Sequence, residues 1–286
     1  MASAQANRRG ILLMLVAMGC YVLNDVFVKL AAQSLPPGQV LAVRGAFATI
    51  FVLALARGTR AGWRTALRPI VGVRCGLEIT TALSSVVALS LAPLATVSAL
   101  MMTAPLMIAA TAMALRWEPW HGARLLATAA GFAGVLLVIQ PSARSEVPAG
   151  LACALLCAAS LAARDLVTRR IPATVPSSII AVATTLAVCL AGLLLGFVER
   201  WAPLTRHELG MLAAAAGCAA LGNYALIVAC RGVDLSVVTP FRYSLIVWAL
   251  LLGYAIWGDL PRPAAAAGVV LIIAAGAFTI RAARGP

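Results

Sequence analysis

GILLMLVAMGCYVLNDVFVKL, residues 10–30, is a nearly uninterrupted apolar run that ends in Asn24, Asp25 and Lys29. An apolar run of about 20 residues is long enough to cross the hydrocarbon core of a bilayer as a helix. The pattern recurs 140 positions later, where equivalent pairs are Gly10 and Gly150, Leu15 and Leu155, Asp25 and Asp165, Lys29 and Arg169, and Pro36 and Pro176. The stretch is therefore the first predicted membrane span and the template of an internal duplication.

The composition excludes a water-soluble globular protein. Hydrophobic residues make up 63% of the 286 positions and charged residues only 11%. The core of a water-soluble protein could not bury so many apolar side chains. A net charge of +13 suggests nucleic acid in a soluble protein, but here the arginines are scattered between apolar runs. We therefore expect a polytopic membrane protein that meets the lipid bilayer and a small-molecule substrate, and no nucleic acid.

Ten spans follow from the apolar runs and from the Pro, Gly and Arg clusters that separate them. They cover approximately residues 10–31, 37–56, 69–91, 94–115, 122–140, 148–168, 176–198, 208–230, 235–256 and 263–281. Most arginines fall in the loops on one side, among them Arg8, Arg9, Arg57, Arg60, Arg64, Arg68, Arg116, Arg124, Arg169, Arg170, Arg231, Arg281 and Arg284. By the positive-inside rule this side is the cytoplasm, so both termini are predicted to be cytoplasmic in a bacterial-type inner membrane.

The duplication predicts an all-α fold made of two five-helix repeats, residues 1–143 and 144–286. Because each repeat has an odd number of spans, the second is expected to insert upside down relative to the first. Inverted repeats of this kind are typical of secondary transporters, whose substrate site lies near the midplane between the repeats.

Small residues and prolines inside the spans predict packing and bending. Gly72-x-x-x-Gly76 and Gly192-x-x-x-Gly196 have the spacing that lets helix backbones approach closely. Pro105 and Pro240 each remove a backbone donor and should bend their helices. All seven cysteines lie in apolar runs without a C-x-x-C motif, which indicates packing residues instead of disulfides or metal ligands.

Glu78 is the most informative charged residue within a span. It lies ten positions beyond Arg68, which places it roughly 15 Å into the membrane. Helical spacing puts Arg74, Glu78, Thr81 and Ser85 on one face, as a polar stripe. Either Arg74 and Glu78 form a local pair that lets the helix insert, or the carboxylate lines a water-filled cavity.

Arg242 enters the ninth span from the cytoplasmic side to a depth similar to that of Glu78. Its guanidinium stays protonated, so it needs a cavity or a partner. One hypothesis is that Glu78 binds the ammonium group and Arg242 the carboxylate of a zwitterionic substrate. The alternative is that the two residues pair with each other and join the repeats.

Asp25 and Arg44 lie at one depth in the outer half of the first two spans. An ion pair of Asp25 with Arg44 or with Lys29 accounts for them structurally, and an outer gate that opens during transport accounts for them functionally.

The second repeat keeps the acid, as Asp165, together with Arg169, but has Thr184 where Arg44 would be equivalent. A matching gate therefore needs another arginine, and Arg164 is the candidate.

Aromatic and soft side chains complete the predicted central cavity, because rings and thioethers suit an apolar substrate group. They are Met14, Met18, Tyr21, Met101, Met102, Asn223, Tyr224, Tyr243 and Trp248.

Motifs for catalysis or for energy from ATP are missing from the sequence. No G-x-x-x-x-G-K precedes Lys29, the chain's single lysine, and no G-x-S-x-G is present. The two histidines, His121 and His207, fall at predicted loops. We therefore expect a protein that is not an enzyme and has no cofactor or metal.

Several local motifs recur in one known family: Asn24-Asp25 followed by Lys29, Arg44-Gly45, the run from Pro105 to Glu118, and Gly131 with Gly134. With these motifs the chain resembles the drug/metabolite transporter superfamily, specifically its EamA-type ten-helix proteins. The resemblance implies five-helix inverted repeats around a central cavity and transport of small metabolites. Within the superfamily the chain looks most like the YddG-type amino-acid exporters.

The sequence and this resemblance predict a secondary or facilitative transporter that exports amino acids, aromatic or apolar ones included, by alternating access. The first alternative is a carrier of another metabolite, such as a nucleoside-type or methyl-donor compound. From a different class, an integral membrane enzyme or a sensor is the remaining alternative. The oligomeric state, the coupling ion and the direction of transport are left open.

Overall fold

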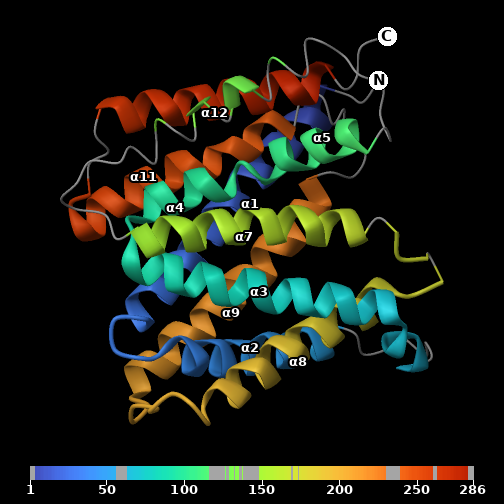
Figure 1. Ribbon diagram of the computed structural model, residues 1–286, viewed down its shortest axis with the longest axis vertical. Helices are drawn as coiled ribbons and strands as arrows, with labels where there is room; N and C mark the ends of the chain where they lie inside the picture. The colour runs from blue at the N-terminus through green and yellow to red at the C-terminus, as the bar shows by residue number, and fades with distance from the viewer. Residues whose placement is uncertain are drawn as a thin grey trace. The chain divides into compact units, whose positions relative to one another are not determined.

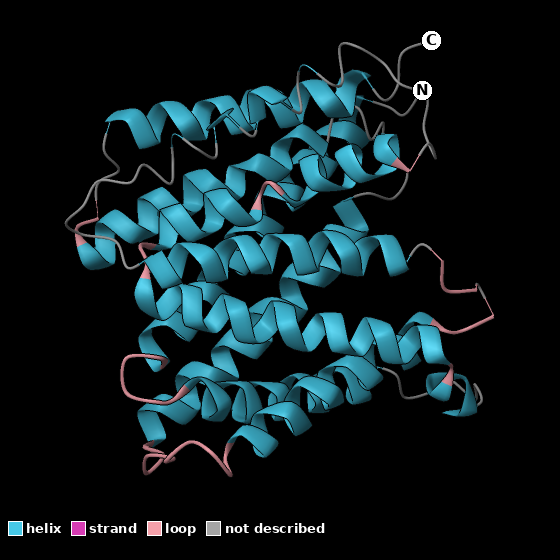
Figure 2. Cartoon of the chain, viewed as in Figure 1, coloured by secondary structure: helices cyan, strands magenta, loops and turns pink. Residues whose placement is uncertain are grey.

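The computed structural model describes residues 4–55, 63–115, 126, 129–131, 133–134, 137, 148–168, 170–172, 174–229, 239–259 and 263–282. In these residues the chain is helical throughout, with turns and loops between the helices (Figure 2). Six helices are long and apolar enough to cross a membrane, and shorter apolar helices accompany them. The described part therefore has the make-up of a polytopic helical membrane protein.

The helices follow the predicted spans closely. They are α1 (Ala4–Ala31), α2 (Pro37–Leu55), η1 (Trp63–Leu67), α3 (Pro69–Leu91), α4 (Leu94–Met101), α5 (Ala104–Ala114), α7 (Pro148–Thr168), α8 (Ser177–Leu195), α9 (Arg206–Ala229), η2 (Thr239–Tyr243), α11 (Ser244–Trp257) and α12 (Pro263–Ala282). The predicted span 122–140 lies for the most part outside the described residues.

The predicted span 94–115 is not one continuous helix, because α4 ends at Met101 and α5 begins at Ala104. Pro105 has no amide hydrogen, so it cannot continue the hydrogen-bond ladder of a helix at this point. Thr103 is fully buried, and its hydroxyl donates a 2.6 Å hydrogen bond to the carbonyl oxygen of Leu100. The proline therefore does more than bend the span: the helix stops, and a threonine hydroxyl satisfies one of its terminal carbonyls.

By their contacts the residues form two compact units. Unit 1 comprises Met1–Val22, Ala92–Leu151 and Leu221–Pro286, and unit 2 comprises Leu23–Leu91 and Ala152–Ala220. Each unit takes segments from both halves of the chain, and α1, α7 and α9 contribute to both. The division into sequence repeats, 1–143 and 144–286, stays a prediction.

In unit 2, α2 and α8 pack against each other at very short distance, and Figure 1 draws them side by side. A Cβ on Gly45 would lie 2.9 Å from the Cα of Cys189, and one on Gly192 would overlap the backbone nitrogen of Ala42. Residue numbers rise along one helix as they fall along the other, so the two helices run antiparallel. Their backbones approach closely because these positions are small.

The expectation for the other glycine pair is wrong for the described residues. No described atom lies within 4 Å of a Cβ built on Gly72 or on Gly76. The glycine spacing in α3 therefore does not mark a helix contact here, whereas Gly192 does.

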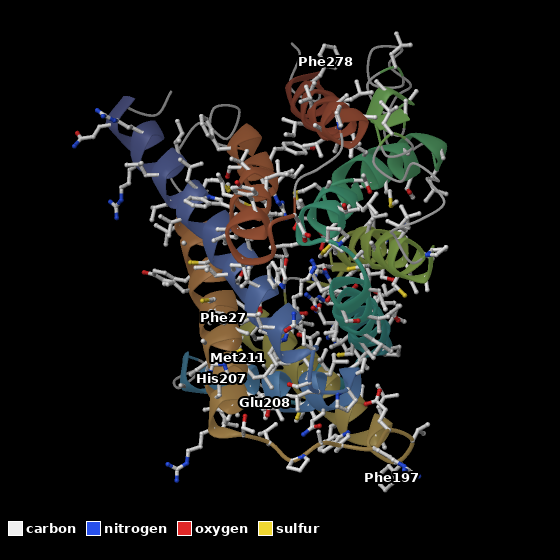
Figure 3. All side chains as sticks on the ribbon, turned by 90° about the vertical axis from the view of Figure 1, so that its left-hand side faces the viewer. Phe27, Phe197, His207, Glu208, Met211 and Phe278 are labelled. Atoms are coloured by element: carbon white, nitrogen blue, oxygen red, sulfur yellow. The ribbon has the colours of Figure 1, made fainter. Side chains whose placement is uncertain are left out.

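Polar contacts tie the loop after α8 to the start of α2 within unit 2. The backbone N–H of Gly38 donates to Glu199 (2.8 Å), and the Gln39 side chain exchanges two hydrogen bonds with the backbone of Ala202 (2.8 and 3.0 Å). The Ser34 hydroxyl donates to Glu208, which Figure 3 shows near the start of α9. These contacts hold the α1–α2 and α8–α9 connections together.

In unit 1, α11 packs on α4, and η2 contacts α12. The indole N–H of Trp248 donates to the carbonyl oxygen of Leu15 in α1 (3.2 Å), and the ring lies against Gly19. On the same helix, Met14 and Met18 are fully buried. Trp248 therefore fixes α11 to the first half of α1.

We predict that Gly192→Ala lowers the stability of the protein by about 1–3 kcal/mol, because the added methyl group would overlap the α2 backbone. The matched control Gly76→Ala should leave stability unchanged or slightly raised, since its methyl group meets open space and alanine favours helix. Thermal unfolding in detergent, followed by size-exclusion chromatography, measures both. Equal melting temperatures for the two variants would contradict the packing described for α2 and α8.

Candidate functional site

Unit 2 contains six charged side chains on four helices, called here the charged cluster, and their contacts form two sets, one around Asp25 and Arg44 and one around Glu78 and Arg164. Its members are Asp25 on α1, Arg44 on α2, Arg74 and Glu78 on α3, and Arg164 and Asp165 on α7. The charged cluster contains three arginines and three carboxylates, so the formal charges cancel. All four helices are among those apolar enough to span a membrane.

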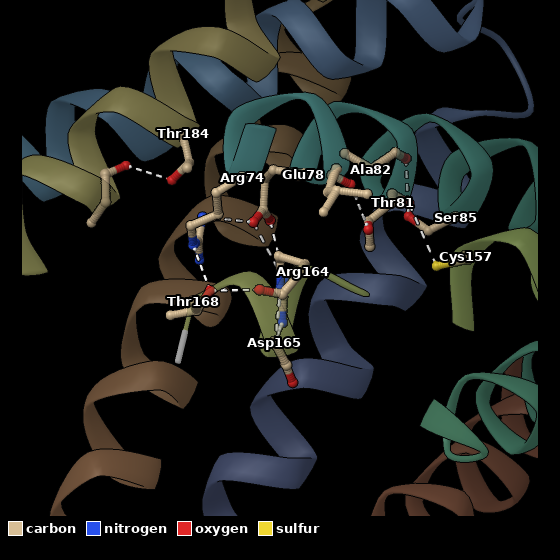
Figure 4. Close-up of polar contacts among 12 residues, drawn as sticks. Arg74, Glu78, Thr81, Ala82, Ser85, Cys157, Arg164, Asp165, Thr168 and Thr184 are labelled. Carbon is tan, nitrogen blue, oxygen red and sulfur yellow. Dashed lines mark hydrogen bonds and ion pairs between the residues drawn. The ribbon is translucent and has the colours of Figure 1, made fainter. Parts of the chain in front are cut away.

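Glu78 lies between two arginines (Figure 4). Arg74, one helical turn earlier, donates to its carboxylate at 3.2 Å, which confirms that the predicted Arg74–Glu78 contact forms. Arg164 on α7 approaches the same carboxylate at 3.4 and 3.5 Å. The Nε of Arg74 also donates to the hydroxyl of Thr168 on α7 (3.0 Å). Glu78 and Arg74 therefore both join α3 to α7.

Arg164 is shared between two carboxylates. Its Nε and Nη2 donate to the Oδ1 atom of Asp165 at 3.1 and 2.8 Å, in addition to its longer contacts with Glu78. A guanidinium does not lose its proton in a protein, so inside an apolar segment it needs a counter-charge. In the structure Arg164 has two such counter-charges, the carboxylates of Asp165 and Glu78.

In the first half of the chain the corresponding acid is linked to its arginine through an amide. Arg44 donates to the side-chain oxygen of Asn24 (3.1 Å), and the Asn24 amide donates to Asp25 (2.9 Å). Asn24 is buried and bridges the two charged groups. The expected association of Asp25 with Arg44 is therefore made through Asn24.

The two equivalent acids have the same kind of neighbour. In both cases the residue directly before the aspartate donates to its Oδ1 atom: Asn24 for Asp25, and Arg164 for Asp165. Thr184, which stands where Arg44 would be equivalent, donates to backbone carbonyls of its own helix. The charge that the second repeat lacks at Thr184 is thus present at Arg164. Arg169, the other predicted partner of Asp165, lies outside the described residues, and Lys29 lies in the last turn of α1.

The polar stripe on α3 continues beyond the charges. The Thr81 and Ser85 hydroxyls donate to carbonyls of their own helix, at 2.8 Å to Leu77 and 3.0 Å to Ala82. The thiol of Cys157 lies 3.5 Å from the Thr81 carbonyl, so this cysteine packs α7 against α3. Contact of Thr81 and Ser85 with a substrate stays a prediction.

The other predicted substrate contacts belong to unit 1. Tyr243 is 4% exposed, and within the described part of the chain its hydroxyl has no hydrogen-bond partner. Tyr224 is 65% exposed, whereas Tyr21, Met101 and Arg242 are partly buried. Trp248 donates to the α1 backbone as described above. Arg242 and Glu78 are in different units, so their predicted cooperation stays a prediction.

Sequence reasoning missed the contact between Arg164 and Glu78. The sequence pattern indicates only partners one helical turn away or at equal depth in the membrane. The available signal was that Arg164, like Glu78, is a charge in an apolar span and therefore needs a partner.

Fold and site together define a class: a polytopic helical membrane protein with paired charges inside its spanning helices, as transporters have. The model of the EamA-like transporter family matches residues 8–140 and again residues 148–281. The chain belongs to the EamA-like transporter family.

Curated relatives match over nearly the full length. The S-adenosylmethionine uptake transporter of Rickettsia bellii (strain RML369-C) is 26% identical, over 90% of this chain and 88% of that protein. That of Rickettsia prowazekii (strain Madrid E) is 25% identical, over 95% and 92%. The pseudopaline exporter CntI of Pseudomonas aeruginosa (strain UCBPP-PA14) is 26% identical, over 94% of both chains.

A solved crystal structure has a similar fold, with a TM-score of 0.66 and 20% identity over 96% of this chain and 99% of that chain. The family and the relatives are transporters of small molecules, and the chain is a multi-pass protein of a bacterial-type inner membrane.

We predict that Glu78→Gln destabilises the protein more than Arg74→Gln does. Removing the Glu78 charge takes a counter-charge from both Arg74 and Arg164, whereas removing Arg74 leaves Glu78 in contact with Arg164. Thermal unfolding of the two variants in the same detergent tests this order. A lower melting temperature for Arg74→Gln than for Glu78→Gln would show that Arg164 does not depend on Glu78.

Proposed function

We propose that the chain is a secondary or facilitative carrier of a small, charged metabolite, most closely of the S-adenosylmethionine type. The observation that carries this proposal is the charged cluster of unit 2. A charged side chain within an apolar span is costly to insert, by roughly 2.5–3.5 kcal/mol at the bilayer centre on insertion scales. Six such residues on four helices are difficult to explain by packing alone, because apolar residues would fill the same space without that cost.

The charged cluster contains positive and negative side chains, so it is complementary to a solute that carries positive and negative groups. S-adenosylmethionine has a carboxylate, an ammonium group, a positively charged sulfonium and an adenosine. The arginines of the charged cluster are complementary to the carboxylate, and its acids to the cations.

The relatives favour transport of a methyl-donor compound, the first alternative predicted from the sequence, over export of amino acids, the main prediction. None of the named relatives is an amino-acid exporter of the YddG type, and two are S-adenosylmethionine uptake transporters. Since the third relative is an exporter, the proposal concerns the class of solute and not the direction of transport.

For the architecture we propose ten spans in two inverted five-helix repeats, with both termini cytoplasmic and alternating access as the mechanism. The two successive matches to one family model support a duplication. The antiparallel packing of α2 and α8, which would be equivalent spans of the two repeats, supports their opposite orientation.

The proposal predicts that proteoliposomes containing the protein take up radiolabelled S-adenosylmethionine at least severalfold faster than empty liposomes. Glu78→Gln, which removes a charge from the cluster, should reduce that uptake about tenfold or more, a loss of one charge interaction of about 1.4 kcal/mol. The matched control Asp259→Asn removes an acid outside the cluster and should retain wild-type uptake.

The same assay includes a mixed pool of labelled amino acids, with and without a pH gradient. Uptake of amino acids but not of S-adenosylmethionine would restore the amino-acid assignment. Uptake of neither, by protein that elutes as a single species, would contradict the proposed solute class.

A further inference from the structure

We infer that Asp165 recognises the sulfonium charge of the solute, and that Arg164 acts as an internal cation that holds this place when the solute is absent. The inference rests on the proposed function and adds to it a residue that determines specificity. It follows from how Arg164 divides its contacts between Asp165 and Glu78.

Asp165 presents one carboxylate oxygen to Arg164 and keeps the other turned away. Both short bonds from Arg164, at 3.1 and 2.8 Å, end on Oδ1. In Figure 4 the far end of the Asp165 side chain points away from Arg164 and Glu78. Oδ2 is thus outside the pairing with Arg164.

Accessibility distinguishes Asp165 from its partners. Its side chain is 35% exposed, compared with 24% for Glu78, 20% for Arg164 and 15% for Arg74. A solute that reaches the charged cluster therefore meets the Asp165 carboxylate more readily than the Glu78 carboxylate. A sulfonium carries a positive charge but no hydrogen-bond donor, so it requires only an accessible anionic oxygen and no directional partner.

When a solute cation takes the place of Arg164 at Asp165, the guanidinium needs another counter-charge, and Glu78 provides it. When a cation binds Asp165, Arg164 has to leave it, and a guanidinium without a counter-charge would be strongly unfavourable in an apolar segment. Glu78 already lies 3.4 Å from Nη1 of Arg164, so a small rotation of the guanidinium strengthens an existing contact. Arg164 therefore stays paired in both states, and the empty site stays neutral.

The arrangement is found at Asp165 and not at the equivalent acid of the first repeat. At the equivalent Asp25 the neighbouring donor is the neutral amide of Asn24, which cannot stand in for a cation. The inferred exchange of an internal cation for a solute cation thus belongs to α7 and α3.

Two probes that differ in this charge test the inference: S-adenosylmethionine and its demethylated form, S-adenosylhomocysteine, in which a neutral thioether replaces the sulfonium. Binding of each to purified protein in detergent is measured as a dissociation constant. We expect the wild type to prefer S-adenosylmethionine by about tenfold, the worth of one charge interaction of about 1.4 kcal/mol. Asp165→Asn should bring the ratio close to one, and Asp259→Asn should leave it unchanged.

For Arg164→Gln we expect the preference for S-adenosylmethionine to change in the opposite direction. This variant tests the inference even if Asp165→Asn does not fold. Removal of the internal cation should raise the preference for S-adenosylmethionine, again by about tenfold, since the solute no longer competes with a guanidinium. A merely structural Arg164 would weaken both probes equally.

An unchanged ratio in Asp165→Asn, or an unchanged or lower ratio in Arg164→Gln, would overturn the inference while the proposed function stands. A wild type that binds neither probe would overturn the proposed function itself. The two failures are therefore distinguishable.

Discussion

The structure of unit 2 depends on one constraint: an arginine inside an apolar helix keeps its charge and must be paired. Arg164 meets this constraint by contacting Asp165 on its own helix and Glu78 on α3. Arg74 contacts Glu78 and Thr168, and Arg44 reaches Asp25 through Asn24. Each pairing crosses from one helix to another or fixes a turn, so the need for counter-charges also determines which helices lie together.

Close packing and polar ties surround this charged cluster. The backbones of α2 and α8 approach each other at Gly45 and Gly192, where no side chain keeps them apart. The bonds of Gln39 with the backbone of Ala202 hold the connections at the ends of these helices. A site whose charges exchange partners needs such a scaffold, because small shifts in helix position would change the distances that the exchange depends on.

The sequence predicted what depends on local patterns. Boundaries of α2, α3, α7, α8, α9 and α12 agree with the predicted spans to within three residues, since long apolar runs bounded by Pro and Arg leave little choice, whereas α1 begins at Ala4 and not at residue 10. The Arg74–Glu78 contact was predictable because four residues make one helical turn. The Arg164–Glu78 contact was not, since it joins residues 86 positions apart and depends on how α7 packs on α3. The interruption at Met102 was only half predicted: the proline indicated a bend, whereas the stop also needed Thr103 to satisfy a carbonyl. Most of the predicted fifth span lies outside the described residues and is untested.

The central claim is that the charged cluster of unit 2 binds the solute. A crystal structure of the protein grown with S-adenosylmethionine tests it most directly. The account predicts the sulfonium within about 4 Å of the Asp165 carboxylate, the distance of an ion pair, and Arg164 closer to Glu78 than the 3.4 Å observed here. A solute bound with none of Asp25, Arg44, Arg74, Glu78, Arg164 or Asp165 in contact would contradict it.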